Sequence, residues 1–166
     1  AGLFDLEHRC TGVEVKGATV VCQHEYLNDV GVAIRSVWTH AFDTAGGVDI
    51  TIEVSVDPEM PPLPRVGMLL LLSDKPEAVS WHGRGPHENY PDRKLSADLG
   101  DWSCDRQAMQ TPYIFPSDNG LRCDVRQAVI GSVCIERIDD NFAFAVSDYG
   151  VESLMRAQHT FECTEQ

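Results

Sequence analysis

Residues 48–57 read Val48-Asp49-Ile50-Thr51-Ile52-Glu53-Val54-Ser55-Val56-Asp57, and apolar and polar side chains alternate along them without a break. Successive side chains of a β-strand point to opposite faces, so a period of two is typical of a strand with one buried and one wet face. This stretch predicts a half-buried strand and is the clearest secondary-structure signal in the chain.

Further strands are predicted on either side of it, because β-branched and aromatic residues cluster between turn signals. The predicted strands span 19–26, 32–42, 65–73, 77–82, 122–127, 133–138, 142–148 and 161–165. The 65–73 run is apolar enough for burial on both faces. Residues 83–121 are predicted as loops, and 151–157 as the single helix. Short strands with frequent turns predict an all-β fold, an antiparallel β-sandwich formed by one domain over 1–166.

Three features of the predicted strands and loops can be checked against a structure. Phe142, Phe144 and Val146 alternate with other residues and should line one face of their strand. Trp38 and Trp81 fall in predicted strands. Trp102 falls in the stretch predicted as loop.

Composition excludes several classes of partner. The chain has 166 residues and a net charge of −13. Nucleic acids and anionic membranes repel such a surface, so we expect neither as a partner. No apolar run is long enough for a membrane helix, and no signal-peptide pattern is visible, so we expect a cytoplasmic protein.

The cysteines give little sign of a metal site. There are six of them, at long and irregular spacings, without a CxxC pair. Zinc sites use closely spaced pairs, so zinc is disfavoured. Cys22, Cys123, Cys134 and Cys163 lie in apolar or strand-like stretches, and we interpret them as reduced core residues.

Two segments carry unusually dense side-chain chemistry. The first, residues 85–93, reads Gly-Pro-His-Glu-Asn-Tyr-Pro-Asp-Arg, and the second, residues 111–123, reads Thr-Pro-Tyr-Ile-Phe-Pro-Ser-Asp-Asn-Gly-Leu-Arg-Cys. They resemble the GPxENYPDR and TPYxFPxENGxRC segments in the C-terminal, small-chain region (domain 5) of bacterial β-galactosidases, glycoside hydrolase family 2. His87 stands at the variable position of the first, and Asp118 replaces the usual Glu of the second.

The resemblance covers nearly the whole chain and implies a fold and a function. The fold would be a large sandwich of the galactose-mutarotase-like type (a supersandwich), truncated at both ends relative to the family domain. The parent enzyme would hydrolyse terminal β-D-galactosides such as lactose with retention, depend on magnesium and sodium, and form an oligomer. The remaining domains or large subunit would be the partners, and galactosides the ligands. This chain lacks the family's two catalytic glutamates, so alone it should be inactive.

The first segment predicts a rigid structural loop. Prolines restrict its backbone, Asn and Asp side chains can hydrogen-bond nearby backbone groups, and an Arg can contact a carboxylate. The residues that we assign to this loop are Gly85, Pro86, Glu88, Asn89, Tyr90, Asp92 and Arg93. We expect it to pack against the catalytic barrel or a neighbouring domain.

The second segment adds aromatic residues and a tight turn. Tyr90, Tyr113, Phe115 and Arg122 are candidates for contact with a sugar or with another domain. An aromatic sugar platform would make the chain a carbohydrate-binding module, which remains an alternative. The resemblance also implies a sodium ion held by backbone carbonyls of Phe115, Pro116, Leu154 and Ala157.

Catalysis by the chain itself is a weaker alternative. A glycosidase needs two carboxyl groups flanking the bond, one with a raised pKa. Glu88 and Asp92 are the available pair, but the charges of Arg84, Arg93 and His87 nearby should lower their pKa values. His82 or His87 with Glu88 could imitate the acid and base of an epimerase, although the epimerase motif is not recognisable.

Overall fold

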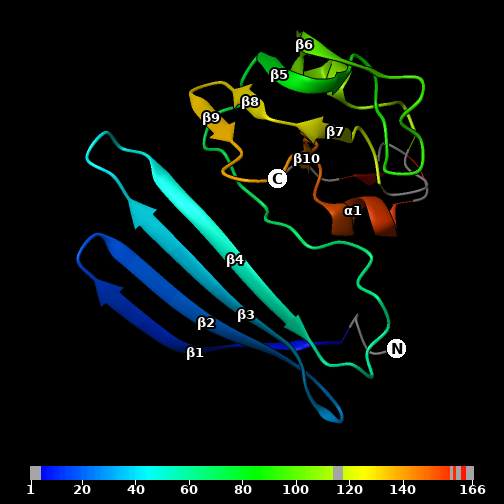
Figure 1. The fold of residues 1–166 in the computed structure, drawn as a ribbon. Helices are drawn as coiled ribbons and strands as arrows, with labels where there is room; N and C mark the ends of the chain where they lie inside the picture. Colours follow the sequence, from blue (N-terminus) through cyan, green and yellow to red (C-terminus); the bar gives the residue numbers. More distant parts are fainter. Residues whose placement is uncertain (1–4, 114–117, 158, 160–161, 164–166) are drawn as a thin grey trace. The chain divides into compact units, whose positions relative to one another are not determined.

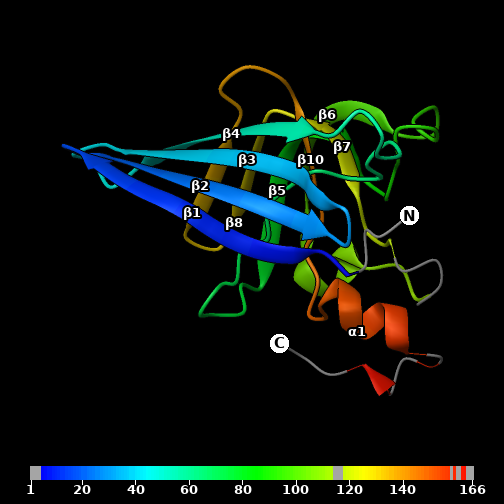
Figure 2. The same cartoon turned by 90° about the horizontal axis from the view of Figure 1, so that it is seen from below.

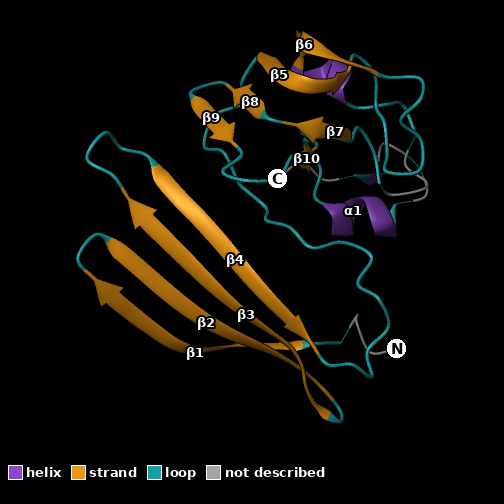
Figure 3. Ribbon diagram, in the orientation of Figure 1, coloured by secondary structure: helices purple, strands orange, loops and turns teal. Residues whose placement is uncertain are grey.

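The computed structural model describes residues 5–113, 118–157, 159 and 162–163, and strands dominate it (Figures 1 and 3). All named strand pairs are antiparallel, which confirms the predicted fold class. The chain divides into two units, residues 1–69 and 70–166. Each unit is described by itself.

The first unit is a four-stranded meander in the order β1-β2-β3-β4, with its strands side by side (Figure 2). The strands are β1 (Glu7–Lys16), β2 (Thr19–Asn28), β3 (Gly31–Phe42) and β4 (Val48–Val56). Side chains bond the backbone at two of the turns. Asn28 Oδ1 accepts from the N–H groups of Val30 and Gly31, and Asp43 Oδ1 accepts from those of Ala45 and Gly47. These Asx-type bonds fix the register of the alternating strands.

The alternation gives this sheet two chemically different faces. In the strand register, Trp38 lies opposite Cys22 on β2 and Ile52 on β4, on an apolar face. The other face carries exposed ion pairs, such as Arg35 with Glu25. The half-buried strand predicted from residues 48–57 is therefore confirmed, with its apolar residues on the same face as Trp38.

The second unit is a small two-layer arrangement of sheets. One sheet has the order β6-β5-β8-β9 and the other pairs β10 with β7. The strands are β5 (Ala78–Gly85), β6 (Asp98–Asp105), β7 (Arg122–Val125), β8 (Gln127–Ile130), β9 (Val133–Glu136) and β10 (Phe142–Phe144). A 3-10 helix, η1 (Arg106–Met109), follows β6, and the short helix α1 (Val151–Arg156) follows β10.

Both sheets and η1 contribute to one hydrophobic core, whose buried members are Val79, Trp81, Met109, Val125, Ala128, Ile130 and Phe144. Phe142 and Val146 pack against this core beside Phe144, as predicted, although β10 ends at Phe144 and the strand was predicted to continue to residue 148. Helix α1 also matches its prediction to within one residue. The core is next to the two motif segments in sequence. β5 leads into the first segment, and the second segment runs into β7.

Three secondary-structure predictions were wrong. Residues 65–73 form no strand, and Leu69 and Leu71 are 75% and 74% exposed. A strand that is apolar on both faces needs cover on both, and every residue of 65–73 is exposed. β1 was missed, and β6, which holds Trp102, was predicted as loop. The strand predicted for 161–165 falls largely outside the described residues.

The cysteines are buried less than predicted. All six are free thiols, and Cys123 is buried in the core. Cys22 and Cys163 are half-buried, whereas Cys134 is exposed. The core prediction was therefore wrong for Cys134, which lies on the exposed face of the edge strand β9. Within the described part of the chain, no helix is long and apolar enough to cross a membrane.

Candidate functional site

The carboxylate of Glu88 joins the two motif segments. Glu88 lies in the loop after β5, and its residue exposure is only 8%. From the second segment, the Tyr113 hydroxyl lies 2.8 Å from Oε2 and the Gly120 N–H donates to the same oxygen at 3.1 Å. From its own loop, Arg93 Nη2 donates to Oε1 at 3.0 Å and the Tyr90 hydroxyl lies 3.1 Å from Oε2. The carboxylate is thus the hub of a network, which we call the Glu88 hub.

These bonds set the charge of the hub. Burial raises the pKa of the Glu88 carboxyl, whereas hydrogen bonds, above all from Tyr113 and the Gly120 N–H, lower it. The bonds outweigh burial, and the pKa falls to about 2. Burial raises the pKa of the Tyr90 hydroxyl in turn. Glu88 is therefore ionised, and both tyrosines are neutral donors, at any pH near neutrality.

Two asparagines hold the backbones of the segments: Asn89 joins the first segment to the second, and Asn119 bonds within the second. Asn89 is fully buried, and its Oδ1 accepts from the Cys123 N–H at 2.9 Å. Its own N–H donates to the Leu121 carbonyl at 2.8 Å. Asn119 closes the second segment on itself, because its Nδ2 donates to the carbonyls of Thr111 and Tyr113. Every side-chain polar group of these asparagines is bonded, as burial of an amide requires.

Arg122 is a buried cation beneath the loop. Its exposure is 2%, and its guanidinium lies over the Trp81 ring, 5.3 Å from the centroid. It donates to the carbonyls of Pro86 at 3.0 Å and Gly120 at 2.9 Å. Burial lowers its pKa. The cation–π contact and carbonyl bonds replace the water that burial removes, and they hold both segments against the core.

An ion triad of Asp124, Arg84 and Lys94 links β7 to β5 and to the loop that follows β5. Asp124 accepts from Arg84 Nε and from Lys94 Nζ, both at 2.6 Å. These bonds, first from Lys94 and then from Arg84, lower the pKa of the Asp124 carboxyl. Asp124 has a φ of 54°, the left-handed region that few residues other than Gly, Asn and Asp adopt. β7 (Arg122–Val125) thus contains a residue with a strained backbone, and two cations hold its side chain in place.

Gly120 and Gly85 are needed for close approach. A side chain at Gly120, where φ is 70°, would place its Cβ 2.4 Å from the Met109 carbonyl oxygen. A Cβ at Gly85 would lie 2.6 Å from the Trp102 ring, whose Nε1 donates to the Gly83 carbonyl at 3.1 Å. The two segments can meet at the hub only because these positions lack side chains.

The pKa values of the described carboxyl groups bear on whether this site could supply a general acid. A general acid in a glycosidase needs a raised pKa. Among the described carboxyl groups, every resolved pKa shift is downward, at Glu7, Glu88, Asp124 and Asp148. Asp92 is exposed, and its side chain makes no hydrogen bond or ion pair with the described residues. The expected downward shift at Glu88 is present, but tyrosines and a backbone N–H cause most of it.

The predicted contact residues fall into three groups. Tyr90 and Tyr113 are brought together, with their hydroxyls 3.2 Å apart, but those hydroxyls are bonded at the hub. Arg122 is buried. Phe115 and Pro116 lie outside the described residues, so the sugar and sodium predictions that use them stay predictions.

The remaining sodium candidates lie at one end of α1. Leu154 is in the helix, and Ala157 is its C-cap residue. The last carbonyls of a helix lack partners within it, so such carbonyls are suitable for a sodium ion. Among the described residues, no group of three or more His, Cys, Asp or Glu side chains is placed to hold a metal.

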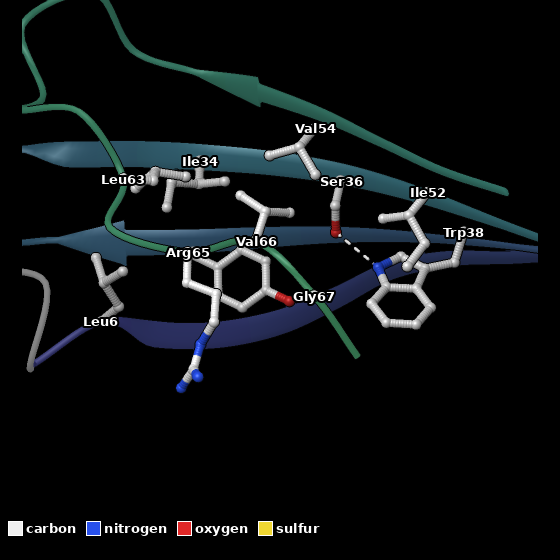
Figure 4. Close-up of a pocket in the computed structure, with 11 residues that line it drawn as sticks. Leu6, Ile34, Ser36, Trp38, Ile52, Val54, Leu63, Arg65, Val66 and Gly67 are labelled. Carbon is white, nitrogen blue, oxygen red and sulfur yellow. Dashed lines mark hydrogen bonds between the residues drawn. The ribbon is translucent and has the colours of Figure 1, made fainter. Parts of the chain in front are cut away.

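A groove in the first unit offers another concave surface (Figure 4). Its volume is about 230 Å³, below the 300–1,000 Å³ typical of ligand pockets. Ile34, Trp38, Ile52 and Val54 form its floor, and the chain at Val66 passes over them (Figure 4). Trp38 Nε1 donates to Ser36 Oγ at 3.0 Å, so its polar atom is already bonded. None of the predicted site residues lines this groove.

Sequence reasoning missed several members of the site. Thr111 and Asn119 were not assigned, although the Asn-Gly pair marks the turn at which Asn119 acts. Asp124 and Lys94 gave no local signal, because they are 30 residues apart and meet only in the folded chain. A left-handed Asp followed by a strand is not recognisable from composition.

Comparison with known proteins gives a consistent result. The profile of the family described as beta galactosidase small chain matches residues 4–166. A beta-galactosidase of Aeromonas hydrophila is 44% identical over an alignment of 165 residues, and the match covers 96% of this chain and 16% of that protein. Those of Psychromonas ingrahamii and Vibrio cholerae are 38% and 39% identical, over 96% and 98% of this chain and 16% of each relative. The chain therefore spans about one sixth of these relatives.

Proposed function

We propose that this chain, which belongs to the β-galactosidase small chain family, is a non-catalytic segment that supports the catalytic domain of a β-galactosidase. The observation that carries the proposal is the Glu88 hub. Its one carboxylate is buried, ionised and surrounded by donors from two segments about 25 residues apart. Such a group stabilises a loop and has no proton to give.

The activity of the whole enzyme is part of the proposal. It would be the hydrolysis of terminal β-D-galactosides with retention, with catalytic glutamates and magnesium supplied by polypeptide outside this chain. Sodium is proposed at the carbonyls of Phe115, Pro116, Leu154 and Ala157. If so, adding Na⁺ in place of K⁺ should raise the melting temperature of the assembled enzyme.

A segment replacement tests the supporting role. In the Aeromonas hydrophila beta-galactosidase, the matching segment is either deleted or replaced by this chain, and hydrolysis of a chromogenic β-galactoside is measured. We expect activity from the chimera, none from the deletion, and none from this chain alone. Activity of the chain alone would overturn the proposal and direct attention to Glu88 and Asp92.

Arg93→Ala in the chimera tests the hub itself. The change removes the donor at 3.0 Å from Glu88 and the cation over the Tyr90 ring. A lower melting temperature with reduced activity is expected, and an unchanged chimera would contradict the supporting role. Binding of free lactose to the isolated chain would instead favour the carbohydrate-binding alternative.

A further inference from the structure

The loop between β5 and β6 ends in a turn whose tip is an exposed leucine. Leu95 is 104% exposed, so the described residues of its own unit leave its side chain uncovered. Two residues later the chain is buried again, because Ala97 is 2% exposed. A single exposed apolar residue is common on protein surfaces and by itself means nothing.

The backbone around Leu95 is held unusually tightly. Arg84 Nη1 donates to the carbonyls of Ala97 at 2.9 Å and Lys94 at 3.4 Å. The Ala97 N–H donates to the Lys94 carbonyl at 3.1 Å, which closes the turn. Fixing a backbone in one conformation costs conformational entropy. The fold therefore orders a residue whose side chain gains no contact within the described chain.

The side chains next to Leu95 are bonded within the chain. Lys94 bonds Asp124 at 2.6 Å, and Arg93 bonds Glu88 at 3.0 Å. Ser96 Oγ lies 3.2 Å from His87 Nε2. Each of the two cations thus has a carboxylate partner, and the tip of the turn presents the methyl groups of Leu95.

The adjoining strand is unsuited to strand addition. β6 is an edge strand, and Asp98, Asp101 and Asp105 lie along it. Charges on an edge strand oppose pairing with another chain. A partner would therefore contact the turn through the leucine side chain, in the way that a buried apolar anchor fills a pocket.

We propose that Leu95 is a docking knob that fills an apolar, uncharged pocket on the β-galactosidase polypeptide outside this chain. The inference rests on the proposed function. The partner follows from length, since the Aeromonas hydrophila relative has 84% of its sequence outside the match. The preformed turn lowers the entropy cost of docking, which is how preorganised anchors gain affinity.

Side-chain footprinting tests this directly. Hydroxyl-radical labelling of Leu95 is compared between the isolated chain and the active chimera, in which this chain replaces the matching Aeromonas hydrophila segment. Val30, at a turn of the first unit, is 95% exposed and serves as the matched control. Labelling of Leu95 should fall by about tenfold in the chimera, as expected for a buried anchor, and that of Val30 should fall less than twofold.

Two variants extend the test. Leu95→Asp should lower the melting temperature of the chimera without changing that of the isolated chain, and Leu95→Met should retain both values. Val30→Asp should alter neither protein. If the Leu95→Asp chimera fails to assemble, Leu95→Ala is used in its place, and a smaller decrease in the melting temperature of the chimera is expected.

The outcomes separate the two proposals. Equal labelling of Leu95 in the chain and in an active chimera would overturn the docking knob and leave the supporting role intact. An inactive, unassembled chimera would overturn both. Protection of Leu95 in the isolated chain that rises with concentration would assign the knob to a second copy and overturn the proposed partner.

Discussion

Asp124 combines a strained backbone with an ion triad, and the two effects can be separated by substitution. Asn also tolerates the left-handed region, so Asp124→Asn should lose only the charge pairing, about 1 kcal/mol. Asp124→Ala should lose about 1–2 kcal/mol more, because Ala resists a positive φ. Urea unfolding of both variants measures the difference. Identical stabilities of the two variants would show that the backbone conformation contributes nothing.

Glu88 is predicted to make folding sensitive to acid. Its folded pKa of about 2 lies below the unfolded value of about 4.3. The stabilisation is therefore fully present above the unfolded pKa and is lost as the pH falls toward the folded pKa. From these values it is about 3 kcal/mol, lost between about pH 5 and pH 2. Urea unfolding at a series of pH values measures this loss.

Glu88→Gln is the matched variant for this pH dependence. An amide cannot be ionised, so the variant should be less stable by about 3 kcal/mol at pH 7 and should lack the Glu88 share of the acid loss. Asp124 and Asp148 also have lowered pKa values and should contribute equally to both proteins. Parallel stability profiles of the two proteins would rule out Glu88 as a source of acid sensitivity.

At the scale of residues, sequence reasoning assigned Glu88 and its neighbours to one loop but did not connect that loop to the second segment. Glu88, Asn89, Tyr90 and Arg93 were assigned to a rigid loop from their density and the flanking prolines. The donors to Glu88 were expected to be its neighbours in sequence. Two of the donors, Tyr113 and the Gly120 N–H, come instead from the second segment, and a separation of 25 residues between Glu88 and Tyr113 leaves no local pattern.

At the scale of elements, the Trp102 side chain of β6 packs against Gly85 of β5 and Gly100 of β6. Gly85→Ala would place a Cβ 2.6 Å from the Trp102 ring and should destabilise the chain by about 1–3 kcal/mol through overpacking. Gly100→Ala is the control, because its Cβ would lie 3.4 Å from the same ring. Thermal unfolding measures both. When Trp102 is also replaced by Ala, the loss of stability caused by Gly85→Ala should largely disappear. An undiminished loss in that double variant would refute the steric cause.

Strand prediction succeeded where one face is buried and failed at edges and at uncovered segments. The residues of β4 alternate because one face is apolar, so periodicity sufficed. β1 and β6 are edge strands with many exposed polar residues, so their amino-acid composition resembles that of a loop. Residues 65–73 were wrongly predicted as a strand because they are apolar. An apolar run forms a buried strand only where other parts of the protein pack against both of its faces.

At the scale of the whole molecule, the uncovered run between the units should be the first site of proteolysis. Leu69 and Leu71 are 75% and 74% exposed in a segment without strand or helix. Proteolysis requires an accessible, unpaired backbone. Limited thermolysin digestion should cut within 66–72 first and give fragments near 1–69 and 70–166, as measured by mass spectrometry. First cleavage within β5 would contradict the description of the segment.

The fold class could be predicted from sequence, and the division of the chain could not. Alternating strands and frequent turns were enough for an antiparallel all-β protein. The boundary between the two units falls between residues 69 and 70, inside the run that was predicted as a buried strand. A continuous apolar run favours one core, and nothing local marks it as a connection.

The three tryptophans give this molecule its own fluorescence reporters. Trp38 belongs to the first unit, whereas Trp81 and Trp102 belong to the second. Trp81 lies beneath the Arg122 guanidinium and is 3% exposed, so its emission should be blue-shifted and protected from iodide quenching. A chain that keeps only Trp38 and one that keeps only Trp81 would therefore report on the unfolding of each unit by colour alone.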